Sequence, residues 1–222
     1  MKIQKKILLM LIFSAFIFAG NKKVEAKDFT GTIVYNITYG DDVDTQTAAM
    51  MPKTMKIIVK GKKTSMEINM GMGTSITVFD TEKNEGFTLM DMMGQKLAMK
   101  MSSEDIDKKN ADVPDVDTEI TGETKEIAGY NCKKAIIKPK DGSEMITVYF
   151  TDELGAGTIN MNNPIFKNID GIMLEFSVNE GGMKMTYTAV KVEKKKVSDK
   201  EFEMPEGYKV MTMEEFSNMY GG

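Results

Sequence analysis

The sequence predicts a mainly β (α+β) fold: a curved antiparallel sheet or half-barrel accompanied by a few short helices. Three observations support this fold class. Many segments of strand length alternate apolar and polar side chains, which is the period of a strand with one buried face. The connections between these segments are short and rich in Gly, Asn and Asp, so neighbouring strands are expected to run antiparallel. Helical sequence patterns, by contrast, are scarce.

A hairpin predicted over residues 124–151 shows the strand pattern most clearly. Its turn, residues 138–143, contains an Asp-Gly dipeptide, which favours a tight turn because both residues tolerate positive φ. In the return arm, Ile146, Val148 and Phe150 share one face, since side chains alternate across a strand. This arm is therefore expected to bury one apolar face.

The same one-sided alternation predicts about nine or ten strands in all. Besides the hairpin arms, they are expected at residues 29–39, 55–60, 64–70, 74–80, 86–91, 96–101, 172–179 and 183–192. Short helices are expected at residues 102–110, where Ser102 and Asp105 resemble a capping pair, and at residues 212–221. Residues 112–118 are acidic and are expected to form a linker.

The first 26 residues predict a secretory signal peptide. Residues 1–6 carry three lysines, residues 7–18 are almost wholly apolar, and residues 24–26 offer an A-x-A-like end. An apolar stretch of this length is too short to span a bilayer, so an uncleaved anchor is the weaker alternative. No cysteine lies near the cleavage region, which argues against a lipid anchor. We therefore expect a periplasmic or secreted protein, with a single β-rich half-barrel domain over residues 27–222.

The composition argues against most classes of enzyme. The 222 residues include no histidine and no arginine, so His-dependent catalytic triads and His-ligated zinc sites are excluded. No glycine-rich phosphate loop follows a strand ahead of a helix. We therefore expect no enzymatic activity, no cofactor and no metal site. The formal net charge of −4 becomes more negative when the lysine-rich leader is removed, which argues against nucleic acid as a partner.

The sulfur-containing residues leave alternatives open. The single cysteine, Cys132, is either buried or able to pair between chains. The 22 methionines often recur two residues apart, as at Met99 and Met101, so that such pairs point to one strand face. They either fill an ordinary core, line an adaptable pocket for lipid-like ligands, or hold Cu(I) through soft thioethers.

Residues 122–134, with the sequence GETKEIAGYNCKK, resemble a family of exported bacterial proteins described as a domain of unknown function. That family looks related to the LolA-like lipoprotein carriers. Weaker matching pieces are FTGTI at residues 29–33, MKIIVKG at residues 55–61 and MPEGY at residues 204–208. The resemblance implies a curved antiparallel half-barrel with short helices against its concave face. It implies no established activity for the family, but the carriers bind acyl chains in that concavity, which suggests the same role by analogy.

The leading interpretation is a periplasmic binding protein that holds a lipid, an acyl chain or another apolar small molecule in a Met- and aromatic-lined half-barrel. The reason is that too little helix is predicted to cover the apolar faces of so many strands. The candidate ligand-binding residues are Tyr35, Ile37, Met66, Ile68, Met99, Ile146, Val148, Phe150, Leu174, Phe176 and Tyr187. The alternative is a non-enzymatic envelope interaction or structural module with a filled core, whose partner is an envelope protein. A Met-rich Cu(I)-binding protein is a third and less favoured interpretation.

Overall fold

The computed structural model describes residues 29–41, 43–69, 73–92, 94–155, 160, 163–180 and 182–220. The expected signal peptide, residues 1–26, lies outside these described residues. So do Met70 and Met72, one of the methionine pairs of the sequence.

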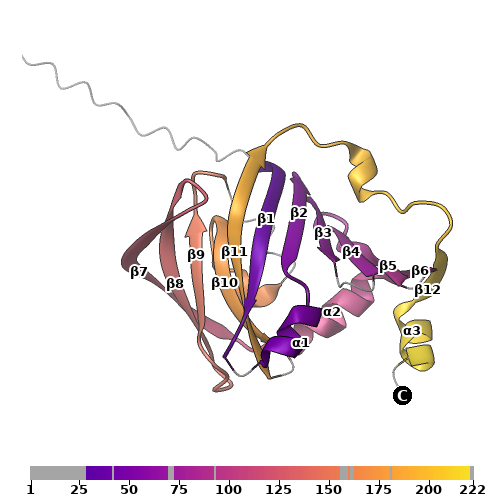
Figure 1. The fold of residues 1–222 in the computed structure, drawn as a ribbon, viewed down its shortest axis with the longest axis horizontal. Helices are drawn as coiled ribbons and strands as arrows, with labels where there is room; N and C mark the ends of the chain where they lie inside the picture. The colour runs from indigo at the N-terminus through magenta and orange to yellow at the C-terminus, as the bar shows by residue number, and fades with distance from the viewer. Residues whose placement is uncertain are drawn as a thin grey trace, which may run out of the picture.

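The described residues form one open sheet of twelve strands (Figure 1). The strands are β1 (Thr30–Tyr39), β2 (Thr54–Lys60), β3 (Lys63–Asn69), β4 (Gly73–Asp80), β5 (Glu85–Met92), β6 (Gln95–Met101), β7 (Val116–Ile127), β8 (Tyr130–Pro139), β9 (Ile146–Thr151), β10 (Ile172–Glu180), β11 (Met183–Lys194) and β12 (Lys209–Thr212). Their order across the sheet is β12-β6-β5-β4-β3-β2-β1-β11-β10-β9-β8-β7. All neighbours pair antiparallel except β12 and β6, which are parallel.

Apart from β12, this order consists of two meanders, β1 to β6 and β7 to β11, in which strands consecutive in the chain pair antiparallel. Most of their connections are short, but α1 lies between β1 and β2, and η2 lies between β9 and β10. The meanders are joined where β11 pairs with β1, from Gly31 opposite Lys194 to Tyr39 opposite Met185. At Gly31 the two backbones approach so closely that an added Cβ would lie 2.0 Å from the Glu193 carbonyl oxygen. A glycine is therefore required at this seam.

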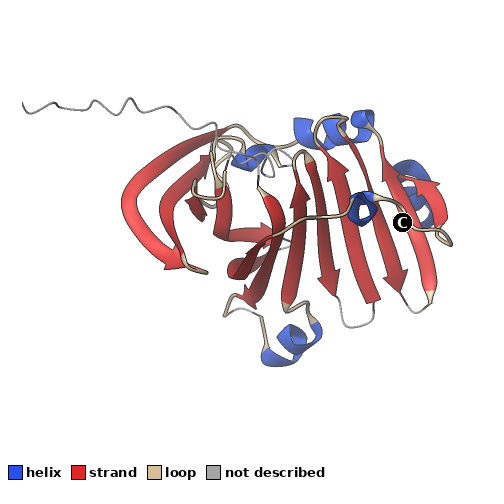
Figure 2. Ribbon diagram, turned by 90° about the horizontal axis from the view of Figure 1, so that it is seen from above, coloured by secondary structure: helices blue, strands red, loops and turns tan. Residues whose placement is uncertain are grey.

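The sheet curls most strongly at the end that carries β7 and β8, whereas β3 to β6 form a flatter array (Figure 2). Register shifts accompany the curvature in three pairs: between Val34 and Tyr35 in β1, between Met173 and Glu175 in β10, and within β7. An irregularity of this kind locally bends a strand and increases its twist. The predicted fold class, mainly β with few short helices, is thus confirmed. The sheet that the strands form is curved (Figure 2).

The helices are few and short: α1 (Thr45–Met50), α2 (Ser103–Ala111), α3 (Met213–Tyr220), and the 3₁₀ turns η2 (Pro164–Phe166) and η3 (Asp199–Phe202). The capping pair expected before residues 102–110 is confirmed, since the Ser102 hydroxyl accepts from the Asp105 amide while the Asp105 carboxylate accepts from the Ser102 amide. The expected C-terminal helix is confirmed as well, with Thr212 and Glu215 bonded in the same reciprocal way.

The hairpin predicted over residues 124–151 needs a correction. Its second half is confirmed, because β8 and β9 pair from Lys133 opposite Phe150 to Ile137 opposite Ile146. Its first half contains an additional turn at Ala128 and Gly129, which separates β7 from β8. Both turn residues have positive φ, 50° at Ala128 and 82° at Gly129. An alanine adopts positive φ rarely, so an Ala-Gly dipeptide is a weak signal for a turn of this kind.

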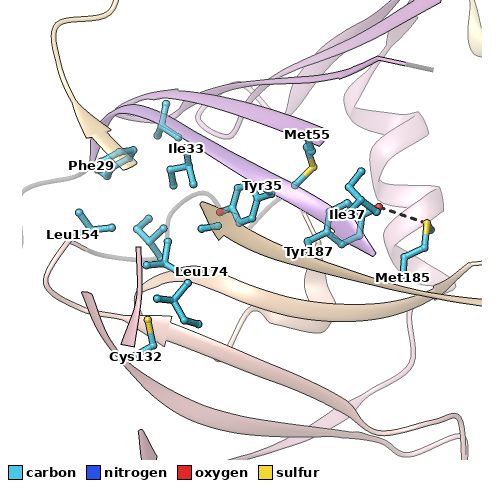
Figure 3. Close-up of a cluster of buried hydrophobic side chains, with 14 residues drawn as sticks. Phe29, Ile33, Tyr35, Ile37, Met55, Cys132, Leu154, Leu174, Met185 and Tyr187 are labelled. Atoms are coloured by element: carbon cyan, nitrogen blue, oxygen red, sulfur yellow. Dashed lines mark hydrogen bonds between the residues drawn. The ribbon is translucent and has the colours of Figure 1, made fainter. Parts of the chain in front are cut away.

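The core lies in three clusters. The largest, called the inner core, fills one face of the sheet at the β1–β11 seam and includes Ile33, Tyr35, Leu174 and Cys132 (Figure 3). A second cluster lies between β8, β9 and η2, where Phe166 packs with Ile137, Val148 and Phe150. The third lies on the opposite face of β2 and β4, where Ile58 and Val78 are covered by Phe202. This cover comes from residues 195–204, called the strap, which run from β11 toward β12 (Figure 1).

Candidate functional site

Most of the predicted ligand-binding residues lie inside the protein. Tyr35, Ile37, Leu174 and Tyr187 belong to the inner core, and none of these side chains is more than 8% exposed. Val148 and Phe150 belong to the second cluster and are 0% and 2% exposed. Alternation along the strands therefore identified the buried face correctly.

Phe176 joins these two clusters through its ring. It stacks on Tyr187 at a centroid distance of 4.9 Å, and it meets Tyr35 and Phe166 edge to face at 6.0 and 5.9 Å. Such geometries are the favourable ones for aromatic pairs. The four rings therefore pack against one another and join the two clusters.

The remaining candidates are half-buried. Met66 and Ile68 pack against the inner core, and Ile146 packs against the second cluster. Met99 lies on β6 and belongs to none of the three clusters. The structure therefore brings ten of the eleven predicted residues into the hydrophobic core and leaves Met99 apart from them.

A groove of about 430 Å³ lies on the other face of the sheet, at the end where β3 begins and β4 ends. It is called the β3–β6 groove, and its residues come from β3 to β6, from the β4–β5 turn, from Ser102 and from the strap. Its floor is apolar, formed by Val78, Phe87, Phe202 and Met204. Val78 and Phe202 are buried, whereas Phe87 and Met204 are half-exposed and face the groove.

The strand register explains why these residues meet. Lys63 pairs with Asp80, and Asp80 in turn pairs with Glu85, which makes one row across three strands. In the next row Val78 pairs with Phe87, and Phe87 pairs with Lys100. Residues opposite each other in antiparallel strands point to the same face, so a charged row borders an apolar one.

The strap forms one wall of the groove and is fixed at η3. The Ser198 hydroxyl caps this turn by accepting from the Lys200 amide at 3.3 Å. The Lys60 amino group donates to the Asp199 carboxylate at 2.8 Å, which ties the strap to β2. Phe202 is therefore held over β2 and β4. The position of this side of the groove is thus fixed by contacts within the chain.

The rim of the groove carries both signs of charge. The Asp80 carboxylate accepts from the backbone amides of Glu82 and Lys83 at 3.0 and 3.3 Å, and Lys83 lies 3.6 Å from Glu85. Among the described residues, no hydrogen bond or ion pair engages the amino groups of Lys63 and Lys100. The rim therefore offers hydrogen-bond donors and acceptors above an apolar floor, which is the usual composition of a site for a small organic ligand.

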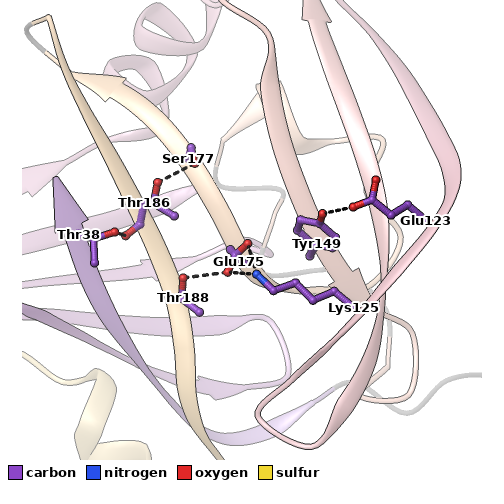
Figure 4. A network of polar contacts seen from close by, with 8 residues as sticks. All are labelled: Thr38, Glu123, Lys125, Tyr149, Glu175, Ser177, Thr186 and Thr188. Atoms are coloured by element: carbon purple, nitrogen blue, oxygen red, sulfur yellow. Dashed lines mark hydrogen bonds and ion pairs between the residues drawn. The ribbon is translucent and has the colours of Figure 1, made fainter. Parts of the chain in front are cut away.

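A second polar arrangement, called the outer cluster, lies on β7 to β11 (Figure 4). Both oxygens of the Glu175 carboxylate accept from the Lys125 amino group, at 2.8 and 2.9 Å, and Glu175 also accepts from the Thr188 hydroxyl at 3.0 Å. Beside it, the Tyr149 hydroxyl donates to Glu123 at 2.5 Å. Lys125 and Lys134 lie 5.2 and 6.0 Å from the centre of the Tyr149 ring.

The titration behaviour of the outer cluster follows from these bonds. Hydrogen bonds from Lys134 and Tyr149 lower the pKa of Glu123, and the bond to Glu123 raises the pKa of Tyr149. Glu123 is therefore an anion at neutral pH, and Tyr149 keeps its proton. A carboxylate with a lowered pKa is a poor proton donor, so we interpret this cluster as a structural network that ties β7, β8, β9 and β10 together.

Within the described part of the chain, no group of three or more His, Cys, Asp or Glu residues could hold a metal ion. Likewise, no helix in that part is long and apolar enough to cross a membrane. The expectations of no metal site and no cofactor stay predictions.

The family described as the N-glycanase peptide, N-terminal domain, matches residues 40–214, which include β2 to β12. The chain belongs to this family. No curated protein matches the chain significantly. The match includes every strand except β1, so it rests on most of the sheet and not on an isolated motif.

Two solved structures of PNGF-II, in space groups P21 and C2, resemble the chain in three dimensions. Both give a TM-score of 0.52 over 86% of this chain, at 17% and 18% sequence identity. These identities are low, so the likeness concerns the fold. The chain spans about a third of the length of these proteins, 33% and 32%.

The comparisons overturn three expectations. The resemblance to LolA-like carriers is wrong, because the matching family is that of the N-glycanase N-terminal domain and the similar structures are PNGF-II. The lipid-binding function inferred from that resemblance is wrong for the same reason, and neither the structural module nor the Cu(I) protein gains support. The prediction of a non-enzyme is wrong as well, because the family is named after an enzyme.

The physical reason for the error in function is visible in the core. The sequence predicted too little helix to cover the apolar strand faces, but here the curled sheet covers them with side chains of its own strands and of η2. The β3–β6 groove was missed because its lining comes from separate segments. One signal was present: Ile76 and Val78 alternate with Ser75 and Thr77, so β4 has its more apolar side on the groove face.

Proposed function

We propose that this chain acts in the enzymatic removal of N-linked glycans from glycoproteins, as the N-terminal part of an N-glycanase. The observation that carries the proposal is the family match over residues 40–214. The likeness of the fold to PNGF-II supports it independently. We further propose that the chain acts in the periplasm or after secretion, which the predicted signal peptide in residues 1–26 supports.

The role that the geometry supports best is binding of the glycoprotein substrate. The chain spans about a third of the length of the PNGF-II proteins, which leaves room for a division of tasks within such an enzyme. In this chain the carboxylates of the outer cluster already accept hydrogen bonds from lysines, whereas the β3–β6 groove presents an open apolar floor with polar groups around it. Open grooves with this composition bind ligands.

Calorimetric titration of the full chain with a glycoprotein that carries one N-linked glycan tests this proposal. The same polypeptide without its glycan serves as the control ligand. We expect the glycosylated form to bind at least about tenfold more tightly, a difference of about 1.4 kcal/mol in binding free energy. Equal affinity for the two forms, or no binding to either, would contradict the proposal.

A further inference from the structure

We infer that the β3–β6 groove binds uncharged sugar rings of the glycan, an inference that rests on the proposed function. Its volume of about 430 Å³ lies within the range of roughly 300–1,000 Å³ that is usual for pockets of small organic ligands. The groove is also built by residues that the fold fixes, because the strand register sets the floor and the Lys60–Asp199 ion pair holds the strap.

The floor suits one face of a pyranose ring. Such a ring presents C–H groups on its faces and hydroxyl groups around its edge. Phe87 offers a half-exposed aromatic side chain in the groove, next to the buried Val78 and Phe202. An apolar aromatic surface removes the C–H face of a sugar from water without leaving a polar group unpaired.

The rim suits the hydroxyl groups at the edge of the ring. A hydroxyl both donates and accepts hydrogen bonds, whereas a phosphate or carboxylate only accepts them. The rim combines the amino groups of Lys63, Lys83 and Lys100 with the carboxylates of Asp80 and Glu85. Because the rim holds acceptors as well as donors, it favours a ligand with many hydroxyl groups, which can donate to the carboxylates and accept from the amino groups.

Lys63 and Lys100 are the residues expected to contact the sugar. They stand on opposite sides of the groove, at the start of β3 and the end of β6, and Phe87 lies between them in the sheet. Neither amino group forms a hydrogen bond or a close ion pair among the described residues, so binding breaks no such bond. Lys63 does lie near enough to Asp199 to help lower the pKa of that carboxyl, but the close ion pair of Asp199 is with Lys60. A hydrogen bond from a charged donor is stronger than one from a neutral donor, so these two lysines should matter for affinity.

The test measures binding of the core disaccharide N,N′-diacetylchitobiose to the full chain by calorimetry. We expect the double variant Lys63→Gln/Lys100→Gln to bind it at least about tenfold more weakly than the wild-type chain. The matched control is Lys62→Gln/Lys209→Gln, which removes the same charge from exposed lysines outside the groove. The control should change the affinity by less than about twofold.

A third variant, Phe87→Leu, keeps an apolar side chain but removes the ring, and it should also weaken binding.

Three results would overturn the inference alone. In the first, the groove variant binds the disaccharide as tightly as the wild-type chain. In the second, inorganic phosphate displaces the disaccharide at millimolar concentration, which would reveal an anion site. In the third, the wild-type chain binds the glycoprotein but not the free disaccharide, so the proposed function stands and the glycan is recognised elsewhere. Absence of binding to both the glycoprotein and the disaccharide would overturn the proposed function together with the inference.

Discussion

Tyr35 carries the largest fully buried side chain among the described residues, and the polar atom of this side chain is hydrogen-bonded inside the core. The Tyr35 hydroxyl donates to the Met173 carbonyl oxygen at 2.8 Å, which links β1 to the irregular part of β10. Burial raises the pKa of this phenol far above its ordinary value, so the hydroxyl keeps its proton and stays a donor throughout the pH range in which the protein folds.

Tyr35→Phe should therefore destabilise the protein. The substitution removes the donor to a buried carbonyl, and leaving such a group without it costs about 1–3 kcal/mol. Urea unfolding followed by circular dichroism would measure the change in the free energy of unfolding. Tyr39→Phe is the matched control, because the Tyr39 hydroxyl bonds to the Pro52 carbonyl near the surface, where water can replace it. Equal effects of the two substitutions would contradict this account of Tyr35.

Cys132 is the only thiol of the chain, and it is 0% exposed. Burial raises its pKa to about 11, which leaves about one thiolate in a thousand at pH 8. We therefore expect the native protein to react with a thiol-specific disulfide reagent only at the rate of unfolding, and the protein in urea to react at once. Rapid stoichiometric reaction of the native protein would show that Cys132 is accessible and able to pair between chains.

At the scale of the elements, the strands with one apolar face were predictable and the rest were not. The strands expected at residues 29–39, 64–70 and 183–192 match β1, β3 and β11 closely, because alternation is a local signal. β7 (Val116–Ile127) was missed, since most of its side chains are polar and exposed and its first residues were assigned to a linker.

Pairing of distant elements leaves no local trace. The β1–β11 seam joins segments that lie far apart in the chain, so the alternation within each of them could not reveal it. The groove depends on this same kind of information, because the strap must first be placed on β2 and β4. Alternation identified which strand face is apolar but not which segment covers it. The structure accordingly places ten of the eleven residues predicted to bind a ligand in the hydrophobic core.

The β1–β11 seam should be sensitive to a single methyl group. In Gly31→Ala the new Cβ would lie 2.0 Å from the Glu193 carbonyl oxygen and 2.9 Å from the Phe29 ring, so the strands would have to separate. Overpacking of this kind costs about 1–3 kcal/mol or more. The matched control is Gly122→Ala, because no atom lies within 4 Å of its added Cβ. Urea unfolding should show a large loss for Gly31→Ala and almost none for the control; similar losses would disprove the close approach.

At the scale of the whole molecule, ion pairs between lysines and carboxylates are spread over the sheet. Lysines lower the pKa values of several carboxyl groups by hydrogen bonding to them, and these groups are Glu119, Glu123, Asp152, Glu193 and Asp199. Each pair has at least one partner open to solvent, so its separate contribution is small and is screened by salt. Their number and their common direction nevertheless give the fold a defined dependence on pH.

The direction of this dependence follows from linkage. A carboxyl whose pKa is lower in the folded than in the unfolded protein contributes stability that is fully present above its unfolded pKa, here 3.8 for Asp and 4.5 for Glu. That contribution is lost as the pH falls through the folded pKa. We therefore expect the urea midpoint to stay nearly constant from about pH 8 to 5.5 and to fall steadily below about pH 4.5. Loss of negative charge also leaves the lysines mutually repelling at low pH, which adds to the decline.

Sodium chloride at about 1 M should lower the midpoint slightly at pH 7 and should change it less at pH 3, where the ion pairs are already broken. A midpoint that is unchanged or higher at pH 3 would show that these carboxylates do not stabilise the folded sheet.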